Sequence, residues 1–322
     1  MPLITAPVIT PPDTGGGGGG STPVPLPEIG YASATYTDPS GTVWPLNNEA
    51  AGWFTLADGV SGLGATLYEL TSDAHPRGGA RLRHAHPLPR AIVWPLYVYG
   101  ETHVEFIGRW RALATAFTRT LREGPGWLEI ARPDGTRRRI AVHYQEGFEG
   151  RGSKGYGIVS DAAVITLWCE DPYWVDPVAI GMHRQTGSLT PFFTPYPTIS
   201  SSQVLGETTV GNPGDVVVWP TWTVTGPASL ITFTHEGTGE SFAVDPNEVG
   251  HGNLLAGQQV TISTDPPTVR YQDGSNWVGA LDWPGAVLWG LAPGDNPVTF
   301  QLNGSGPGSA VDLVFNPRYE TA

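Results

Sequence analysis

Residues 102–123 read THVEFIGRWRALATAFTRTLRE, and they carry the clearest helical period in the chain. Apolar residues recur there at steps of three and four, which places them on one face of a helix: Ile107, Trp110, Ala114, Phe117 and Leu121. Thr102 and Glu105 have the spacing of a capping box, in which each side chain bonds the backbone amide of the other residue. Gly124 and Pro125 then end the pattern. The sequence therefore predicts one helix over residues 102–123.

The segments around this helix favour strands. Apolar residues alternate over 127–144 on both sides of the turn at 133–136, Pro-Asp-Gly-Thr, which is typical of a β-hairpin. Runs rich in β-branched and aromatic residues predict further strands at Arg90–Tyr99 and Asp161–Cys169. We interpret residues 31–180 as one α+β unit, a β-sandwich that carries a single helix.

The rest of the chain reads as a second unit made only of strands. Residues 181–210 are rich in Thr, Ser and Pro, which is typical of a linker. Over residues 211–322, short β-like segments alternate with turn residues, and no helical period occurs. These segments are Val216–Val224, Leu230–Thr234, Ser241–Val244, Val260–Ser263, Val269–Tyr271, Val287–Leu291, Val298–Leu302 and Val311–Phe315. We therefore expect a mainly β protein whose second unit is a β-sandwich or jelly roll.

The composition agrees with a β-rich chain. It includes 43 Gly and 31 Pro among 322 residues, too many for long helices, and its 12 Trp provide side chains for a buried core. Residues 1–30 have the Pro-rich and Gly-rich composition of a flexible or extended arm. Neither a membrane span nor a secretory signal is apparent in the sequence. A single cysteine, Cys169, excludes an internal disulfide, which fits assembly in a reducing cytoplasm.

Charge is unevenly distributed along the chain. The net charge is −13, yet residues 77–154 hold 14 of the 17 basic residues, while residues 187–322 hold two basic residues and twelve acids. A basic block in an acidic chain is compatible with nucleic-acid binding, with a self-complementary assembly surface or with ordinary solvated charge. The candidate assembly interface consists of the arginines on the predicted helix and hairpin: Arg109, Arg111, Arg119, Arg122, Arg137, Arg138 and Arg139.

Motifs of catalysis are missing from the sequence. It contains no nucleophile elbow, no phosphate-binding loop, no dinucleotide fingerprint and no HExxH pattern. His84 and His86, with His75 nearby, lie on one side of an extended segment, as metal ligands can, but surface or core histidines are the better interpretation. We therefore expect no catalytic residue, no cofactor and no metal.

Tryptophans are concentrated in the second unit. Large aromatic residues usually pack in cores, and we expect this of Trp219, Trp222 and Trp289, which lie in strand-like runs. Trp277 and Trp283 lie among Gly, Asn, Asp and Pro, so core packing and an exposed surface for stacking on sugar rings stay equally open for them. These two residues are the candidate glycan contacts.

Several segments together resemble a known family. They are the stretch Arg-Gly-Gly-Ala at 77–80, the Trp-containing helix, the hairpin, Cys169–Trp174 and, in the second unit, Trp289–Asn296. In this order they are similar to siphophage distal tail (Dit-like) proteins, of the type found as minor tail proteins in phages of actinobacteria. The resemblance covers residues 31–322, and the arm at 1–30 departs from it.

The resemblance implies a structural protein of the virion. Such proteins form a homohexameric ring that joins the tail tube to the baseplate, leaves a lumen for DNA, and carries galectin-like C-terminal domains on its outside. The implied partners are other copies, the tail tube, hub, tape-measure and receptor-binding proteins, after assembly in the host cytoplasm. No catalytic residue belongs to the pattern. A glycan-binding adhesin for the host cell wall is the main alternative, followed by a glycan hydrolase and a nucleic-acid binder.

Overall fold

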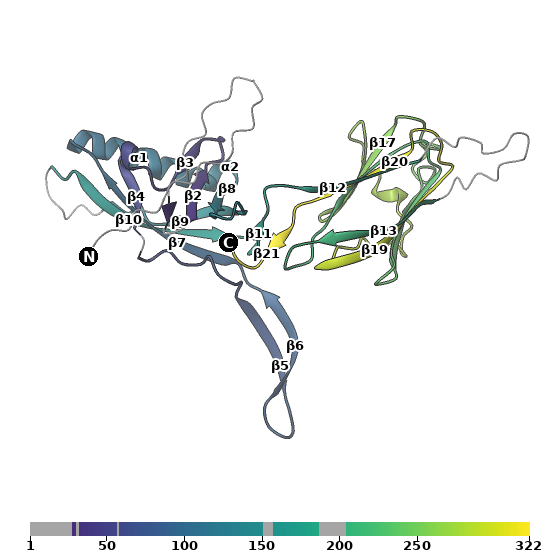
Figure 1. Cartoon of the computed structure of the whole chain (residues 1–322), viewed down its shortest axis with the longest axis horizontal. Coiled ribbons are helices and arrows are strands. Elements are labelled where there is room, and N and C mark those ends of the chain that lie inside the picture. Colours follow the sequence, from purple (N-terminus) through teal and green to yellow (C-terminus); the bar gives the residue numbers. More distant parts are fainter. Residues whose placement is uncertain (1–27, 30–31, 57, 151–156, 187–203) are drawn as a thin grey trace, which may run out of the picture.

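The computed structural model describes residues 28–29, 32–56, 58–150, 157–186 and 204–322. The protein is mainly β, as the sequence predicts, with two bodies side by side and one hairpin that projects from the first (Figure 1). We name these bodies the first unit, which contains the two α-helices, and the second unit, which contains the strands between residues 180 and 315. Each unit has its own buried hydrophobic cluster.

The first unit is built on one curled antiparallel sheet with the strand order β1-β2-β8-β9-β10-β7-β4. Its strands are β1 (Glu28–Ile29), β2 (Ala32–Thr37), β4 (Trp53–Thr55), β7 (Arg90–Tyr99), β8 (Gly126–Ala131), β9 (Arg137–Glu146) and β10 (Ser160–Cys169). Short strands extend it: β3 (Val43–Pro45), β11 (Trp174–Val175) and β21 (Arg318–Tyr319). The helices are α1 (His103–Thr118), α2 (Thr120–Glu123) and a 3-10 turn at Glu49–Ala51.

Helix α1 begins at the predicted residue but buries a different face. The Thr102 hydroxyl accepts a hydrogen bond from the Glu105 amide at 3.2 Å, as a capping residue does. The buried side chains are Phe106, Leu113, Ala116 and Phe117, whereas Leu121 is 60% exposed. The predicted apolar face is therefore correct at Phe117, but it is wrong by one position at Phe106 and Leu113, and Leu121 is not part of it.

Adjacent apolar residues explain this error. Phe106 and Ile107 both fit a helical period, as do Leu113 and Ala114, and the core takes the larger side chain of each pair. The predicted single helix also divides at Arg119, which ends α1 and precedes α2. Ile107 and Trp110 pack at the margin of the core instead of at its centre.

The second unit is a sandwich of two antiparallel sheets. One sheet has the order β12-β20-β14-β17-β18 and the other β13-β19-β15-β16. Their bounds are β12 (Ile180–Gln185), β13 (Val204–Asn212), β14 (Thr221–Thr225), β15 (Leu230–His235), β16 (Glu240–Val244), β17 (Gln259–Thr264), β18 (Pro267–Tyr271), β19 (Gly294–Asn303) and β20 (Ala310–Phe315), with a 3-10 turn at Val278–Ala280. Trp222 of one sheet stacks on Phe233 of the other at 4.7 Å between ring centroids, so the two sheets share one core.

Two predicted strands of the second unit differ from the structure. The run Val216–Val224 becomes a strand only from Thr221, because Pro220 has no amide to donate to a sheet. The run Val287–Leu291 forms a single bridge, between Leu291 and Val218, instead of a strand. A Cβ on Gly290 would lie 2.7 Å from the Val217 side chain, so glycine is needed for this close approach.

The linker predicted over 181–210 is wrong at both ends. Strand β12 continues to Gln185 and β13 begins at Val204, while residues 187–203 lie outside the described residues. Both strands are at sheet edges, where one side of the strand stays unpaired and polar residues are tolerated. Their glycines and polar residues therefore resemble loop sequence. The arm predicted at 1–30 also lies outside the described residues, except for Glu28–Ile29 in β1.

Candidate assembly surface

A projecting hairpin is the most exposed element of the first unit. Strands β5 (Tyr68–Ala74) and β6 (Ala80–Pro87) pair only with each other, and every residue from Leu67 to His86 is exposed. Its turn contains Gly78 and Gly79, both with positive φ, which glycine adopts without strain. Figure 1 shows this hairpin, the β5–β6 ribbon, pointing away from both units.

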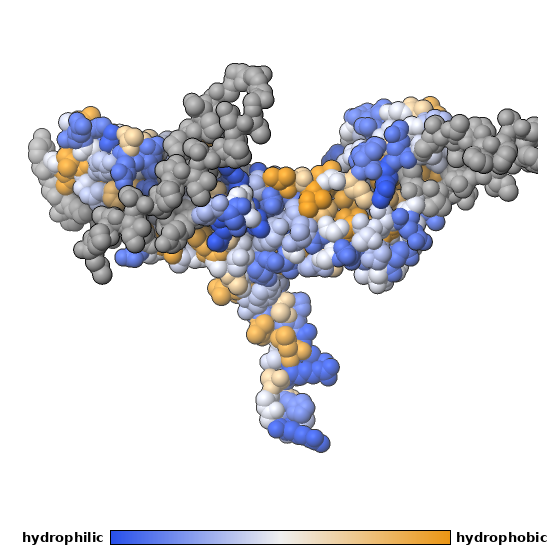
Figure 2. Space-filling view, in the orientation of Figure 1, coloured by the Kyte–Doolittle hydropathy of each residue, from blue (hydrophilic) through white to orange (hydrophobic). Residues whose placement is uncertain are grey.

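The two faces of the β5–β6 ribbon differ in chemistry. Cross-strand partners share a face, so Leu70 with Ala85 and Ser72 with Leu82 lie on the side of Tyr68 and Ala74. This apolar face is open to solvent: Leu70 is 63% and Leu82 57% exposed, and Figure 2 shows apolar residues in orange along the ribbon. Soluble proteins seldom expose so many large apolar side chains together without a binding role.

The opposite face of the ribbon is polar. Asp73 forms an ion pair with Arg83, and the rings of His84 and His86 lie 6.3 Å apart. Among the described residues, no group of three or more His, Cys, Asp or Glu side chains is arranged to hold a metal ion. The metal arrangement considered for His75, His84 and His86 therefore gains no support from the geometry.

The helix arginines of the predicted interface contact their own unit. Arg109 donates to the Tyr99 carbonyl at 2.7 Å and pairs with Glu105. Arg119 lies 3.4 Å from Asp38 and 3.3 Å from Glu123. Arg111 and Arg122 are exposed, so only these two helix arginines keep their side chains largely available to another molecule.

The hairpin arginines are also engaged inside the chain. Arg137 pairs with Glu129 at 2.8 Å. Arg138 lies 3.5 Å from Asp176 and 3.5 Å from the ring centroid of Tyr319. Arg139 stacks over the Trp127 ring at 4.5 Å, and its buried Nε has no partner among the described residues. These contacts give the three side chains structural roles within the unit.

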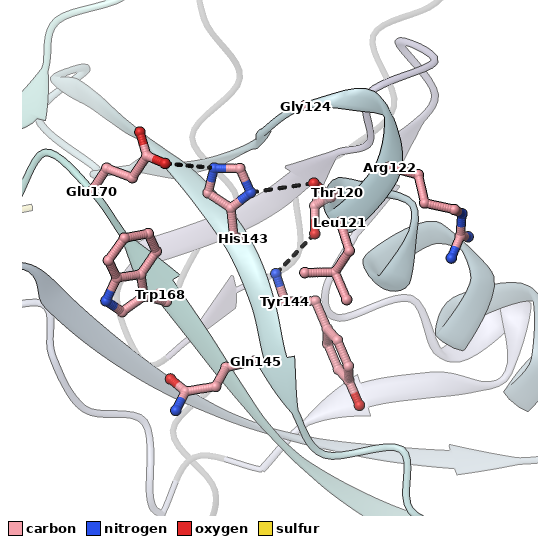
Figure 3. A pocket seen from close by; sticks show the side chains of 9 residues that line it. All are labelled: Thr120, Leu121, Arg122, Gly124, His143, Tyr144, Gln145, Trp168 and Glu170. Atoms are coloured by element: carbon pink, nitrogen blue, oxygen red, sulfur yellow. Dashed lines mark hydrogen bonds and ion pairs between the residues drawn. The ribbon is translucent and has the colours of Figure 1, made fainter.

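A pocket of about 640 Å³ opens beside α2 at the end of β9 and β10 (Figure 3). The Thr120 hydroxyl accepts the amide of Tyr144 at 2.8 Å, which joins α2 to β9. His143 lies between the Thr120 carbonyl at 3.2 Å and Glu170 at 3.7 Å. Trp168 lies on the pocket wall and is 39% exposed. Exposed indole and carboxylate groups suit a protein surface better than a buried catalytic centre.

A second, acidic groove of about 390 Å³ lies further along β10. Its walls include Trp110, Glu146, Glu149 and Asp161, and its floor includes outward residues of β10 (Ala162, Val164 and Thr166). Glu146 accepts a hydrogen bond from Thr166 at 3.1 Å. The outward side of β10 thus leads from the acidic groove to the pocket at Trp168.

The segment after β20 returns to the first unit and holds the base of the ribbon. Its Glu320 carboxylate accepts the Tyr68 hydroxyl at 2.6 Å and the Thr66 amide at 3.1 Å. Ala322 belongs to the core of the first unit, although the sequence assigns residues 211–322 to the second. Residues 318–322 lie against the first unit because strand β21 pairs with β11 there.

Buried Arg90 completes this attachment. Its guanidinium donates to the carbonyls of Pro172 and Gly62, each at 2.7 Å, and to the Glu320 carbonyl at 2.8 Å. Burial lowers the pKa of Arg90, which nevertheless remains a strong donor. Burial alone would raise the pKa of Glu320, but hydrogen bonds from Tyr68 and Thr66 outweigh it and hold that pKa below its usual value.

The single cysteine has no catalytic character. Cys169 lies at the end of β10 in the core of the first unit. Burial raises the pKa of its thiol to about 12, so the thiol stays protonated at neutral pH. Among the described residues, no helix is long and apolar enough to cross a membrane.

The two candidate glycan contacts lie in different environments. Trp277 is only 5% exposed, and its ring stacks in parallel on Tyr271 at 4.7 Å. Trp283 is 55% exposed, with its indole nitrogen donating to the Val278 carbonyl at 3.1 Å. Only Trp283 of this pair therefore presents an open ring. Trp219, expected in the core, is 41% exposed, whereas Trp222 and Trp289 are buried as predicted.

The sequence matches no family model and no curated protein. Solved phage structures do match its fold. The Dit protein of phage SPP1, described as a paradigm of the hub adsorption apparatus in phages that infect Gram-positive bacteria, is 14% identical, with a TM-score of 0.62 over 89% of this chain and 98% of that chain. The chain has a Dit-like fold.

Two further neighbours are structures of the phage P2 baseplate in its activated conformation, one with Ca and one with Sr. They are 12% and 13% identical, with TM-scores of 0.50 and 0.51. The matches cover 90% and 91% of this chain and 99% and 100% of the other chains. Hub and baseplate proteins of phage tails are thus the structural neighbours of the Dit-like chain, as the sequence resemblance predicts.

In this Dit-like chain, the β5–β6 ribbon is an exposed surface that the sequence did not predict. The signal was present, since Tyr68, Leu70 and Ala74 alternate with polar residues, and Gly78 and Gly79 mark a turn. Alternation shows that a strand has one apolar face, but it does not show whether the protein itself covers that face.

Proposed function

We propose that this protein is a structural component of a siphophage tail tip. In this proposal its copies form a homohexameric ring that joins the tail tube to the baseplate and leaves a lumen for DNA. The observation that carries the proposal is the likeness to the SPP1 Dit protein over 89% of this chain and 98% of that chain. A match over nearly the whole length of both chains argues for a shared architecture of two units, not for one common module.

The distribution of exposed groups supports self-association. The β5–β6 ribbon presents an apolar face that no other described element of the chain covers. The described residues offer no metal cluster, and their one thiol is buried. A head-to-tail contact between identical copies closes into a ring when the rotation between them is cyclic. We assign the first unit, residues 31–180, to the ring, and the galectin-like second unit, residues 211–322, to its outside.

The same proposal assigns partners and location. The ring would contact the tail tube protein on one side and hub, tape-measure and receptor-binding proteins on the other. Assembly would take place in the host cytoplasm before the ring enters the virion. Genomic DNA would pass through the lumen. The protein would perform no catalysis.

Electron microscopy with single-molecule mass measurement tests this function. The purified full-length protein is measured at micromolar concentration in low and high salt, and its particles are imaged by negative stain. We expect particles of about six copies with a central hole. A strict monomer under both salt conditions, together with no labelling of the tail tip by antibodies on intact virions, would contradict the proposal.

A glycan-binding tail adhesin is the second candidate function. It is favoured by the open ring of Trp283, which is 55% exposed in the second unit. Flat aromatic faces stack on the C–H surfaces of sugars. The test measures binding of the intact protein to host cell-wall glycans. Loss of binding in Trp283→Ala, with binding kept in the matched variant Trp219→Ala, would support this function. Absence of binding by the wild type would contradict it.

A further inference from the structure

We propose that the apolar face of the β5–β6 ribbon of one copy packs on the outward face of β10 of a second copy. In this arrangement the basic tip of the ribbon lies in the acidic groove beside β10. This inference rests on the proposed function and adds to it the two surfaces and the charged residues that form the contact. The receiving surface is defined as the β10 row: Ala162, Val164, Thr166 and Trp168.

The ribbon would be stabilised by a partner that covers its apolar face. An isolated two-stranded hairpin is marginally stable in water, and an exposed apolar face adds to its tendency to associate. Among the described residues, only its base is held by other parts of the chain, through the hydrogen bonds of Tyr68 with Glu320 and Tyr173. Leu70 and Leu82, well beyond that base, have large exposed surfaces. A covering layer from another molecule would bury both leucines.

The β10 row is a matching apolar surface. Val164 is 54% and Trp168 39% exposed, and both point outward because alternate residues of β10 fill the core. At about 3.3 Å per residue, the row from Ala162 to Trp168 spans roughly 20 Å. Strand β5, from Tyr68 to Ala74, has the same number of steps and therefore the same length. The two surfaces therefore match in length.

Opposite charges lie where this packing would bring them together. Arg77 is in the turn at the tip of the ribbon, and Arg81 lies near the tip on β6, opposite Asp73 on the polar face; neither arginine forms an ion pair with another described residue. Glu146, which lies opposite Thr166, and Glu149 border the acidic groove, which runs along the β10 row from Ala162 to Thr166, and they too lack an ion pair within the described part of the chain. Complementary charge of this kind sets register and partner choice at an interface.

The partner is a second copy because both surfaces occur on every chain and cannot meet within one. Figure 1 shows the ribbon pointing away from the sheet that contains β10. A contact between two different surfaces of identical chains is head-to-tail. Each copy would therefore contact one neighbour through its ribbon and another neighbour through its β10 row. Such a contact repeats around a ring.

Charge reversal with rescue tests the ionic part of the contact. Full-length R77E/R81E and E146R/E149R are compared with wild type by mass measurement over a concentration series. We expect each double variant to raise the midpoint concentration for assembly at least tenfold, and the quadruple variant, which reverses both sides, to restore most of it. The matched control is R184E/R270E, whose exposed arginines lie on the second unit. Unchanged assembly in both double variants would overturn the proposed contact.

Cross-linking tests the apolar part. Leu82→Cys and Val164→Cys are made in separately tagged full-length chains, mixed and oxidised; native Cys169 is buried and does not interfere. A covalent dimer that contains both tags is expected. The matched control replaces Val164→Cys by Val314→Cys, an exposed valine on β20.

The outcomes separate this inference from the proposed function. If wild type forms rings but Leu82→Cys and Val164→Cys give no mixed dimer, the contact is wrong and the ring function stands. If wild type remains monomeric and no mixed dimer forms, both proposals fall. A mixed dimer that is equally abundant with Val314→Cys would indicate random collision, and it would also overturn the contact.

Discussion

Two hairpins of this protein have the same local chemistry and opposite surroundings. In β15–β16, Phe233 pairs with Phe242 across the strands, and both side chains are fully buried in the sandwich. In β5–β6, Leu70 pairs with Ala85 in the same antiparallel manner, but every residue along the strands is exposed except Pro87, which is partly buried. The comparison shows that an apolar hairpin face stabilises the monomer only where a second layer covers it. Where no layer covers it, the same face is available to a partner.

The largest expected effect is a truncation in the covered hairpin. Phe233 contacts Trp222, Phe242 and Phe300 at 4.7, 5.2 and 5.6 Å between ring centroids. We expect Phe233→Ala to lower the free energy of unfolding by about 3–5 kcal/mol, because it removes apolar contacts and leaves a cavity. Urea unfolding monitored by tryptophan fluorescence measures this change. A loss below about 1 kcal/mol would mean that the sandwich core is packed differently.

The matching substitution in the uncovered hairpin should separate stability from assembly. Leu82 is 57% exposed, so Leu82→Ser should change the free energy of unfolding of the monomer by no more than about 0.5 kcal/mol. The same variant should raise the concentration needed for assembly, since the buried leucine surface is lost from the contact. Unfolding at submicromolar concentration and mass measurement give the two values. A large loss of monomer stability without any change in assembly would contradict the contrast between the hairpins.

A smaller effect is expected at the base of the ribbon. Hydrogen bonds hold the pKa of Glu320 below its usual value in the folded protein. The ionised carboxylate therefore stabilises the fold fully when the pH is above the unfolded pKa, which is about 4.3. This stabilisation is lost as the pH falls through the folded pKa. At pH 7, Glu320→Gln should speed amide hydrogen exchange over residues 66–87. The wild type should approach the exchange pattern of this variant as the pH is lowered toward 3. Equal protection in both proteins at pH 7 would show that the base does not depend on this carboxylate.

The smallest effect is expected between the edge strand β12 and its neighbour β20. His183 lies 2.6 Å from Asp312, and this hydrogen bond raises the pKa of the imidazole. Its contribution to stability is therefore full below the unfolded pKa, about 6.5, and is lost as pH rises through the raised folded pKa. Because both side chains are exposed, His183→Gln should lower Tm slightly at pH 5.5 and not at pH 9. Thermal melts at both pH values provide the measurement, and an equal shift at the two values would exclude the ion pair as its cause.

Local patterns predicted much of the first unit. The structure has a strand at Arg90–Tyr99 and an α1 cap at Thr102, both where the sequence predicts them. These features depend on neighbours within a few residues, so the chain alone carries the information. The helix face was wrong by one position, because Phe106 and Ile107 are adjacent and only the shape of the core selects between them.

The candidate site was less accessible from the sequence. A cluster of arginines indicates positive charge, but Arg119 and Arg138 prove to be paired with acids that are distant in sequence, Asp38 and Asp176. The acidic groove could not be predicted either, since Glu146 and Thr166 are brought together by the register of β9 and β10. Charge partners across strands depend on register, which composition does not reveal.

The sequence by itself determined that this chain is β-rich, that it carries a capped helix before a hairpin, and that its basic residues are concentrated in residues 77–154. These properties follow from side-chain period and turn chemistry, which act over a few residues. Only the tertiary structure decided which apolar faces are covered, which arginines are paired, and that Glu320 and Ala322 return to the first unit. Burial and long-range pairing are set by how distant segments pack, and packing is a property of the whole chain.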